Sequence, residues 1–324
     1  MGPPLDRAPD GPSGQRGIGL WAGFSLSIPL YLFGNHRLFP SHPSQFRRLT
    51  AGELGRTRMI HFKLSVRKLM LVVAVAAIGF AMIELFRRGV ESARSLSCTN
   101  QMKELTFAVI SYTEWYNRGN GGEFPRGQIL ANMPPEMGTS WIHQASGYLD
   151  VSAVYTTTDP SKPFDVVPNL TYSRLSIGSL TCPKCPMTTT AGGFATTSYV
   201  GIAGVGADAP ILAAGHPRAG IFGYTRVTRM ADLKDGAART MMLAETGLNN
   251  GCWMSGGSST IRSADPAQRP YIGAGRPFGG FHEGGANVAF ADGSVRFIRG
   301  TIDPAVFEAL TTIAGGDVVG DDFE

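Results

Sequence analysis

Two of the four cysteines stand three positions apart, in the segment Cys182-Pro-Lys-Cys185. A C-x-x-C pair offers two thiolate ligands, whereas a structural zinc site needs four, and the sequence has no second pair of this kind. A thioredoxin-type redox site lies at the start of a helix in a βαβ unit, which the flanking glycine- and threonine-rich sequence does not provide. In an oxidising compartment, disulfides or buried free thiols among Cys98, Cys182, Cys185 and Cys252 are the structural alternative. We favour disulfides or thiols, with metal binding and redox chemistry left open.

His282 and Asp292 are separated by nine residues and offer an imidazole and a carboxylate. They could be two metal ligands or an acid–base pair, but a third partner is not identified by spacing. Four further residues carry suitable groups without a recognisable ligand spacing: His143, His216, Glu245 and Glu283. We therefore favour a structural role, in which His282 hydrogen-bonds a loop and Asp292 forms an Asx-type turn.

The remaining candidates for chemistry are weaker. Residues 258–260 of the segment GGSST could hold an anion, but no helix or P-loop lysine follows, and a loop is favoured. Trp115, Tyr116 and Trp141 could stack on sugars, although Trp115 and Tyr116 are better suited to docking a helix on a sheet. No hydrolase, metalloprotease or dinucleotide motif stands in a supporting context. The sequence thus predicts no enzyme, no cofactor and no metal.

An apolar run precedes all of these residues. Leu69 to Phe86 reads LMLVVAVAAIGFAMIELF and contains one charge, Glu84. As a helix it would span roughly 27 Å, enough for a bilayer core. The alternatives are a buried core helix and a cleaved signal peptide, but no clear small-x-small cleavage site follows. Basic residues flank the run on both sides: Lys63, Arg67, Lys68, Arg87 and Arg88.

The distribution of charge supports a membrane segment. Residues 1–58 carry seven arginines and three acids, and residues 59–88 carry five basic residues and one acid, so each segment is +4. The rest of the chain, with 17 basic and 21 acidic residues, is −4. An acidic body argues against nucleic-acid binding, which needs a basic face. The positive-inside rule predicts a cytoplasmic N-terminus and a body outside the cytoplasm.

Residues 1–58 are rich in Pro, Gly, Ser and Arg and contain a second apolar patch, Ile18 to Phe33, which is interrupted by Pro29 and could be a short membrane segment. The sequence from Met59, MIHFKLSVRKLMLVV, is typical of a protein start with a basic region before a hydrophobic run. We therefore expect 1–58 to be a disordered or over-extended N-terminal segment.

A second helical pattern follows the apolar run directly. Residues of an apolar stripe recur at three- and four-residue steps, and glycines from Gly119 onward end the pattern. Because no strong breaker other than Gly89 stands between the two patterns, we expect one long helix, apolar in its first half and packed on a globular head in its second. The stripe consists of Cys98, Met102, Leu105, Val109, Tyr112 and Tyr116.

From Phe124 onward, short apolar runs alternate with Gly, Pro, Asn and Asp, which predicts strands and loops. Residues 132–179 are expected to be irregular, whereas 196–206 and 240–244 are expected to contain strands. Asp292-Gly293 is expected to be a two-residue hairpin turn with positive φ, with Val288 and Phe290 alternating before it and Val295 and Phe297 after it. Asp303-Pro304 should cap a short helix that Gly315-Gly316 closes.

At these residues a family resemblance becomes specific. His282, nine residues and then Asp292-Gly293 resembles the H-x9-DG module of a bacterial prepilin-like (type II secretion pseudopilin-like) family of unknown function, also labelled solute-binding-like. The resemblance covers about 89–318, with the module itself at 278–318, and it implies a pilin-like architecture. Other segments match in the same order: SARSLSCTNQMKEL with Cys98 and Asn100, EFP at 123–125, TCP at 181–183, SYVGIAG at 198–204 and LKDGAARTMMLAE at 233–245.

Members of that family usually carry a prepilin signal of the form G-F-T-L-I-E before the apolar stretch. Here the nearest match, Gly79-Phe80-Ala81-Met82-Ile83-Glu84, lies at the far end of the stretch, with only Leu85 and Phe86 following. Gly79, Phe80 and Glu84 therefore form a displaced prepilin motif, and we expect an uncleaved anchor.

Together these features predict an α+β, pilin-like fold with a long N-terminal helix, an antiparallel β-rich head and a short C-terminal helix. We expect three parts: segment 1–58, a basic flank and transmembrane helix at 59–88, and an exported domain at 89–324. The leading interpretation is a non-catalytic, membrane-anchored structural or assembly protein of the cell envelope. Its partners would be membrane lipid around residues 69–86 and other pilin-like subunits or secretion machinery. The alternative is a membrane-tethered solute- or glycan-binding protein with an unknown ligand.

Overall fold

The computed structural model describes residues 65–116, 119, 121–130, 132–317 and 320. The chain divides into two compact units, 1–63 and 64–324. The expected N-terminal segment 1–58, with its apolar patch at 18–33 and the proposed start at Met59, lies outside the described residues. All described residues belong to the second unit.

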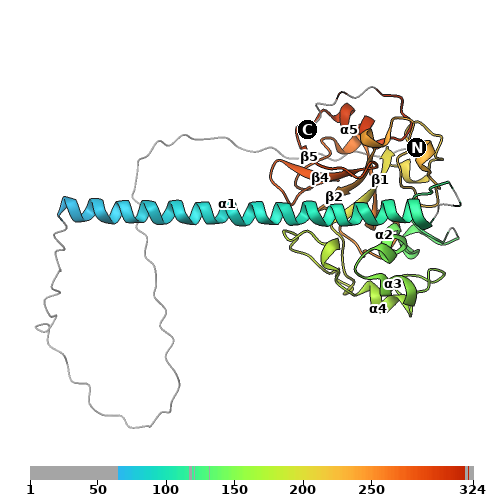
Figure 1. Cartoon of the computed structure of the whole chain (residues 1–324), viewed down its shortest axis with the longest axis horizontal. Coiled ribbons are helices and arrows are strands. Elements are labelled where there is room, and N and C mark those ends of the chain that lie inside the picture. The colour runs from blue at the N-terminus through green and yellow to red at the C-terminus, as the bar shows by residue number, and fades with distance from the viewer. Residues whose placement is uncertain (1–64, 117–118, 120, 131, 318–319, 321–324) are drawn as a thin grey trace, which may run out of the picture. The chain divides into compact units, whose positions relative to one another are not determined.

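One helix dominates this unit. Helix α1 runs without interruption from Val66 to Ser111, and a π-helical turn, Tyr112–Tyr116, follows directly (Figure 1). At 1.5 Å per residue its 46 residues extend roughly 70 Å. Gly79 and Gly89 do not break it, and a Cβ at either position would meet open space. The continuous helix expected from the two adjacent sequence patterns is therefore confirmed.

Among the described residues, no other part of the chain covers the apolar first half of α1. From Leu69 to Phe86 the large apolar side chains are all more than half exposed, with fractions of 53–73%. Removing one such side chain from water is worth about 1.5–3 kcal/mol, so the set represents roughly 20–30 kcal/mol of unfavourable exposure in water. That exceeds the whole folding stability of a typical domain, about 5–15 kcal/mol. The helix is long and apolar enough to span a membrane.

The second half of α1 packs on the head along the predicted stripe. Cys98, Met102, Leu105 and Val109 are fully buried, and Tyr112 is 8% exposed. The side chain of Tyr116 lies outside what the structure describes. Since stripe residues recur at three- and four-residue steps, they form one face of the helix, and this face contacts the main hydrophobic core.

The head is built on a five-stranded sheet in the order β3-β1-β2-β4-β5. Helix α1 contributes to the core on one face, and α5 (Pro304–Thr311) packs into the core on the other, so the two helices lie on opposite sides of the strands in Figure 1. The sheet is mixed rather than wholly antiparallel as expected, because β1 pairs with β3 in parallel. The strands are β1 Tyr199–Val205, β2 Met241–Glu245, β3 Ile261–Ala264, β4 Gly285–Phe290 and β5 Val295–Arg299.

The β4–β5 hairpin forms where it was predicted, but its turn differs. Gly293 has the expected positive φ (+91°), but the predicted two-residue turn is wrong, because four residues separate the strands. Asp292 Oδ1 accepts hydrogen bonds from Ser294 N (2.9 Å) and Oγ (2.7 Å), which closes an Asx-type turn instead. The strand faces differ too, since Phe297 is 38% exposed and Ile298 is fully buried.

One segment that was expected to be irregular contains regular structure, and one strand was not predicted. Segment 132–179 holds three short α-helices, α2 (Trp141–Ala145), α3 (Ser152–Thr157) and α4 (Asn169–Ser173). Strand β3 follows the serine-rich loop and joins the sheet by pairing with β1. The start of the C-terminal helix matches the expectation: Asp303 accepts a hydrogen bond from Ala305 N (2.7 Å) as the N-cap, and Pro304 is the first helical residue. Its end does not, because α5 stops at Thr311, before the Gly315-Gly316 pair that was expected to close it.

The stripe on α1 yields a paired test. Leu105 is fully buried, whereas Phe107, two positions on, is 67% exposed. Replacing Leu105 by Ala leaves a cavity beneath the helix and should lower the free energy of unfolding of the head by about 2–5 kcal/mol. Phe107→Ala should change it by no more than about 0.5 kcal/mol. Denaturant titration of the full chain in mild detergent measures both, and equal effects would contradict this packing of the helix.

His143 yields a test of pH dependence. Burial in α2 lowers the pKa of His143 from 6.5 to about 4, and its Nε2 lies 2.6 Å from Thr158 Oγ1. Between pH 6.5 and 4, the imidazole of His143 therefore binds a proton in the unfolded chain but not in the folded chain. Stability from this group is present above pH 6.5 and is lost as pH falls towards 4, by up to about 3 kcal/mol. His143→Gln should flatten that part of the profile of unfolding free energy against pH.

Candidate functional site

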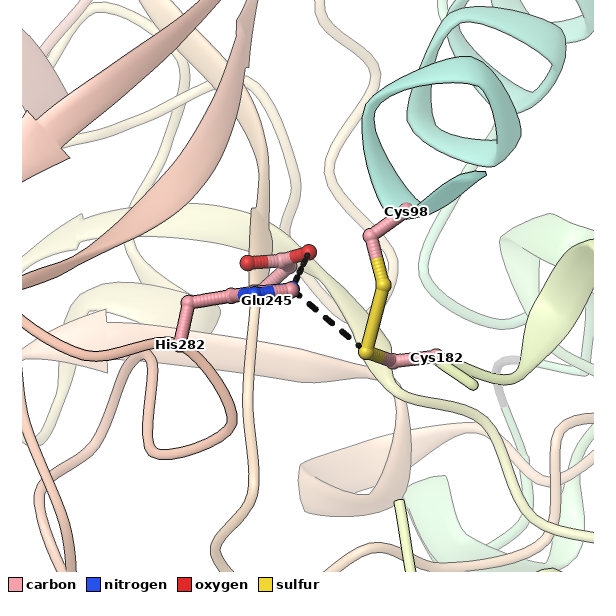
Figure 2. A group of neighbouring side chains, drawn as sticks. All are labelled: Cys98, Cys182, Glu245 and His282. Carbon is pink, nitrogen blue, oxygen red and sulfur yellow. Dashed lines mark hydrogen bonds and ion pairs between the residues drawn. A yellow bond between two sulfur atoms is a disulfide. The ribbon is translucent and has the colours of Figure 1, made fainter. Parts of the chain in front are cut away.

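Four side chains from distant parts of the sequence meet beside the second half of α1, which contributes Cys98 (Figure 2). Cys98 belongs to α1, and Cys182 to the loop that precedes β1. Glu245 is the last residue of β2, and His282 lies in the loop that leads into β4. Their sulfur, oxygen and nitrogen atoms all lie within 4.8 Å of one another. Cysteine, histidine and glutamate are the ligand types of transition-metal sites.

Cys98 and Cys182 form a disulfide that ties α1 to the head. Their Cα atoms are 5.4 Å apart, and 84 positions separate them in the sequence. Both cysteines are buried, with exposed fractions of 0 and 1%. The loop makes a second contact with the helix, since Lys184 pairs with Glu91 of α1. The bond therefore fixes one point of the long helix against the edge of the globular head.

Glu245 is a fully buried carboxylate held by the neighbouring strand. Its Oε2 accepts a hydrogen bond from Asn287 N (2.8 Å), and its Oε1 accepts one from Asn287 Nδ2 (2.9 Å). This pairing follows from the antiparallel register of β2 and β4, in which Ala244 lies opposite Val288. Asn287 Oδ1 in turn accepts a hydrogen bond from Thr99 Oγ1 of α1 (3.2 Å). A short polar chain thus connects the sheet to the helix beside the disulfide.

His282 brings the two halves of the group together. Its Nε2 lies 3.5 Å from Cys182 Sγ and 3.5 Å from Glu245 Oε1. Its side chain is only 4% exposed. The contact with sulfur is of ordinary length, whereas 3.5 Å to an oxygen is long for a hydrogen bond. The imidazole is therefore positioned against both groups without being tightly bonded to either.

Tyr199 completes the polar surroundings. It lies opposite Glu245 in the β1–β2 ladder, and its hydroxyl donates to Gln101 Oε1 of α1 (3.0 Å). Burial first, and then the charge of Glu245, raise the pKa of Tyr199 well above its usual value. The phenol therefore stays protonated and keeps its donor role. Gln101 also donates through Nε2 to Gly178 O (2.9 Å), next to the cysteine loop.

The structure separates other residues that the sequence grouped together. Asp292 belongs to the hairpin turn and is not part of the group around His282. Cys185, three positions after Cys182, donates its thiol to Met187 O (3.0 Å), and it is a free, half-buried cysteine. Cys252 is the other free cysteine, and burial raises the pKa of its thiol to about 11. The C-x-x-C pair therefore contributes one cysteine to the site and not two.

Several weaker candidates also receive definite places. Gly79, Phe80 and Glu84 lie in the exposed half of α1, where Glu84 forms an ion pair with Arg88 (3.7 Å). Trp115 was expected to dock the helix on the sheet, but its side chain is 65% exposed, so that expectation is wrong. Trp141 cannot stack on a sugar, because it is fully buried and donates to Thr260 O (2.8 Å).

Asn287 and Thr99 are the site residues that sequence reasoning missed. The only signal for Asn287 is an amide inside the otherwise apolar strand segment GANVAF, and Glu245 similarly ends the apolar segment MMLAE. A polar side chain in a fully buried strand must find a partner, because an unpaired buried polar group is costly. That rule shows that a partner exists, but it does not reveal which residue it is.

The four cysteines should differ sharply in reactivity. In the native chain without reductant, we expect one thiol, Cys185, to react quickly with a thiol reagent at pH 8. Cys252 should react only on unfolding, because a pKa of about 11 leaves roughly one thiolate per thousand molecules. Cys98 and Cys182 should stay unreactive until the disulfide is reduced. Cys185→Ser should remove the fast phase alone; four reactive thiols in the unreduced, unfolded chain would exclude the disulfide.

Comparison with known proteins gives one match. A family model described as a protein of unknown function (DUF1559), with the label SBP_bac_10, matches residues 88–305. Neither the curated proteins nor the solved structures provide a match. The matched segment begins in the middle of α1, includes all four residues of the buried group and the whole sheet, and ends at the start of α5. On this match the chain belongs to the DUF1559 family of proteins of unknown function.

Proposed function

We propose that this protein is a membrane-anchored, non-catalytic component of the cell envelope, with a structural or assembly role like that of a pseudopilin. The observation that supports this most directly is the division of α1. One continuous helix has a bare apolar half and a half that packs on a globular head. The bare half needs a membrane or other apolar partners, and the packed half passes any force on the head directly to the anchor.

The orientation follows from charge. The basic residues on the N-terminal side of the apolar run, with the arginines of 1–58, favour a cytoplasmic N-terminus, and the acidic body then lies outside the cytoplasm. A buried disulfide between the helix and the head agrees with an oxidising location for the head. The displaced motif at Gly79 and Glu84 leaves too little apolar sequence behind it for a processed pilin helix, so the anchor is retained.

If the protein assembles with a second copy or with another pilin-like chain, the contacts should form on one side of the molecule. Leu96 lies on α1 between the apolar half and the packed half and is 65% exposed, whereas Ile211 lies on the head and is 74% exposed. A photo-cross-linker placed at Leu96, in membranes that hold the full chain, should capture a second copy or another pilin-like chain. The same group at Ile211 should not. Monomer at both positions would reject the assembly proposal, and complete extraction of the chain by alkaline carbonate would reject the anchor.

The family label favours a second candidate, a membrane-tethered solute-binding protein. An open hollow beside the cysteine loop is lined by Arg94, Lys184 and Phe281, together with several glycines. Two cations and an aromatic ring would suit an anionic sugar or a similar solute. A bound ligand should raise the melting temperature of the full chain by mass action. If no anionic or neutral glycan in a panel raises the melting temperature, the solute-binding candidate is rejected and the assembly proposal remains.

A further inference from the structure

We infer that the four buried side chains can be linked in two alternative ways, by the disulfide or by a bound zinc ion. When the Cys98–Cys182 bond is reduced, the two cysteines, His282 and Glu245 form a four-ligand site for one zinc ion. The four ligand atoms already lie within 4.8 Å of one another. The metal would join α1 to the head at the point where the disulfide joins them. The site depends on neither membrane insertion nor assembly.

The ligand set suits zinc. Structural zinc sites in proteins have four ligands in tetrahedral geometry, drawn from cysteine sulfur, histidine nitrogen and carboxylate oxygen. The C-x-x-C pair alone offers two of them. The fold adds an imidazole and a carboxylate from elsewhere, and it replaces Cys185 by Cys98. Since Cys185 Sγ is directed to Met187 O, it does not compete for the same position.

The distances agree with a tetrahedron. Zinc bond lengths of about 2.0–2.3 Å place neighbouring ligand atoms about 3.3–3.8 Å apart. His282 Nε2 lies 3.5 Å from Cys182 Sγ and 3.5 Å from Glu245 Oε1, so two edges of the tetrahedron are already formed. Opening the disulfide lets the two sulfur atoms separate to such a distance. The cysteines come from a helix and a loop, and a small movement of the loop is sufficient for this.

The surroundings already orient the ligands. Metal-binding carboxylates in proteins are held by further hydrogen bonds, and Glu245 receives two from Asn287. Glu245 is fully buried, and a buried carboxylate gains most from a nearby positive charge. In Figure 2 the imidazole of His282 lies between the carboxylate and the sulfur of Cys182, so all three ligand types face a common centre.

The chemistry balances in two steps. A dithiol or phosphine reductant supplies two electrons, and with two protons the S–S bond becomes two thiols. Zn²⁺ then displaces both thiol protons as it forms two Zn–S bonds, while the neutral imidazole and the carboxylate bind through Nε2 and Oε1. Oxidation reverses the sequence: the S–S bond re-forms, two electrons pass to an oxidant such as a disulfide, and the ion is released. Thiolate ligation and the disulfide exclude each other.

Cobalt is the probe that tests this site. The full chain in mild detergent is reduced with a phosphine, freed of reductant without air, and titrated with Co²⁺ and then with Zn²⁺. We expect one Co²⁺ per chain, the visible absorption of tetrahedral cobalt, a sulfur-to-cobalt charge-transfer band, and full displacement by Zn²⁺. The unreduced chain should give neither spectrum. Absence of both bands from the reduced chain, or equal binding by the unreduced chain, would overturn the proposal.

Matched variants identify the ligands. Cys98→Ser and His282→Ala should abolish the tetrahedral spectrum, whereas Cys185→Ser and His216→Ala should keep it. Asn287→Ala should weaken Zn²⁺ binding about 10–100-fold, because it removes the support of Glu245. His282→Ala keeps both cysteines, so re-formation of its disulfide, measured by thiol count, shows that the variant is folded. Loss of the spectrum with Cys185→Ser and retention with Cys98→Ser would instead assign the metal to the C-x-x-C pair and refute this site.

Discussion

The bond between Cys98 and Cys182 stands where α1 passes from an exposed apolar rod to a packed core helix. The head contacts α1 along one face of its second half only, although the helix is about 70 Å long. Closing a loop of 84 residues removes unfolded-state entropy worth about 4.5 kcal/mol in the chain-entropy model, which is comparable with the whole stability of a small domain. The attachment of helix to head therefore depends on this one cross-link more than on any single apolar contact.

The buried disulfide lies beside polar side chains that need hydrogen-bond partners inside the fold. Glu245 at the end of β2 and Asn287 inside β4 are polar side chains in two fully buried strands, and each would be destabilising alone. Together they satisfy one another, and Thr99 extends the chain of hydrogen bonds to α1. The sheet thereby presents a polar group at one point of an apolar face, and the register of α1 that brings Cys98 to Cys182 also places Thr99 against Asn287.

Local patterns in the sequence were sufficient for α1, α5 and several strands, but not for α2, α3, α4 and β3, and not for the site. The stripe from Cys98 to Tyr112 and the cap at Asp303 were predictable because helix periodicity and capping are set by residues three or four positions apart. The parallel β3 strand, the choice of Cys98 over Cys185, and the Glu245–Asn287 pair depend on neighbours tens of positions away. The hairpin at Gly293 is an intermediate case. Nearby residues were sufficient to predict its location, but the form of its turn followed from the register of β4 on β5.

If α1 can be joined to the head either by zinc in the reduced state or by the disulfide in the oxidised state, the order of membrane insertion and oxidation matters. If the apolar half of α1 enters the membrane before the head reaches an oxidant, the head must hold the helix by packing alone, or by a metal. Thiolates bound to zinc are also kept from pairing with the wrong cysteine, which here would be Cys185, three positions from Cys182. The same geometry that admits zinc would then guide oxidation to the Cys98–Cys182 pair, because His282 lies against Cys182 and the Glu245–Asn287 pair is hydrogen-bonded to Thr99 of α1.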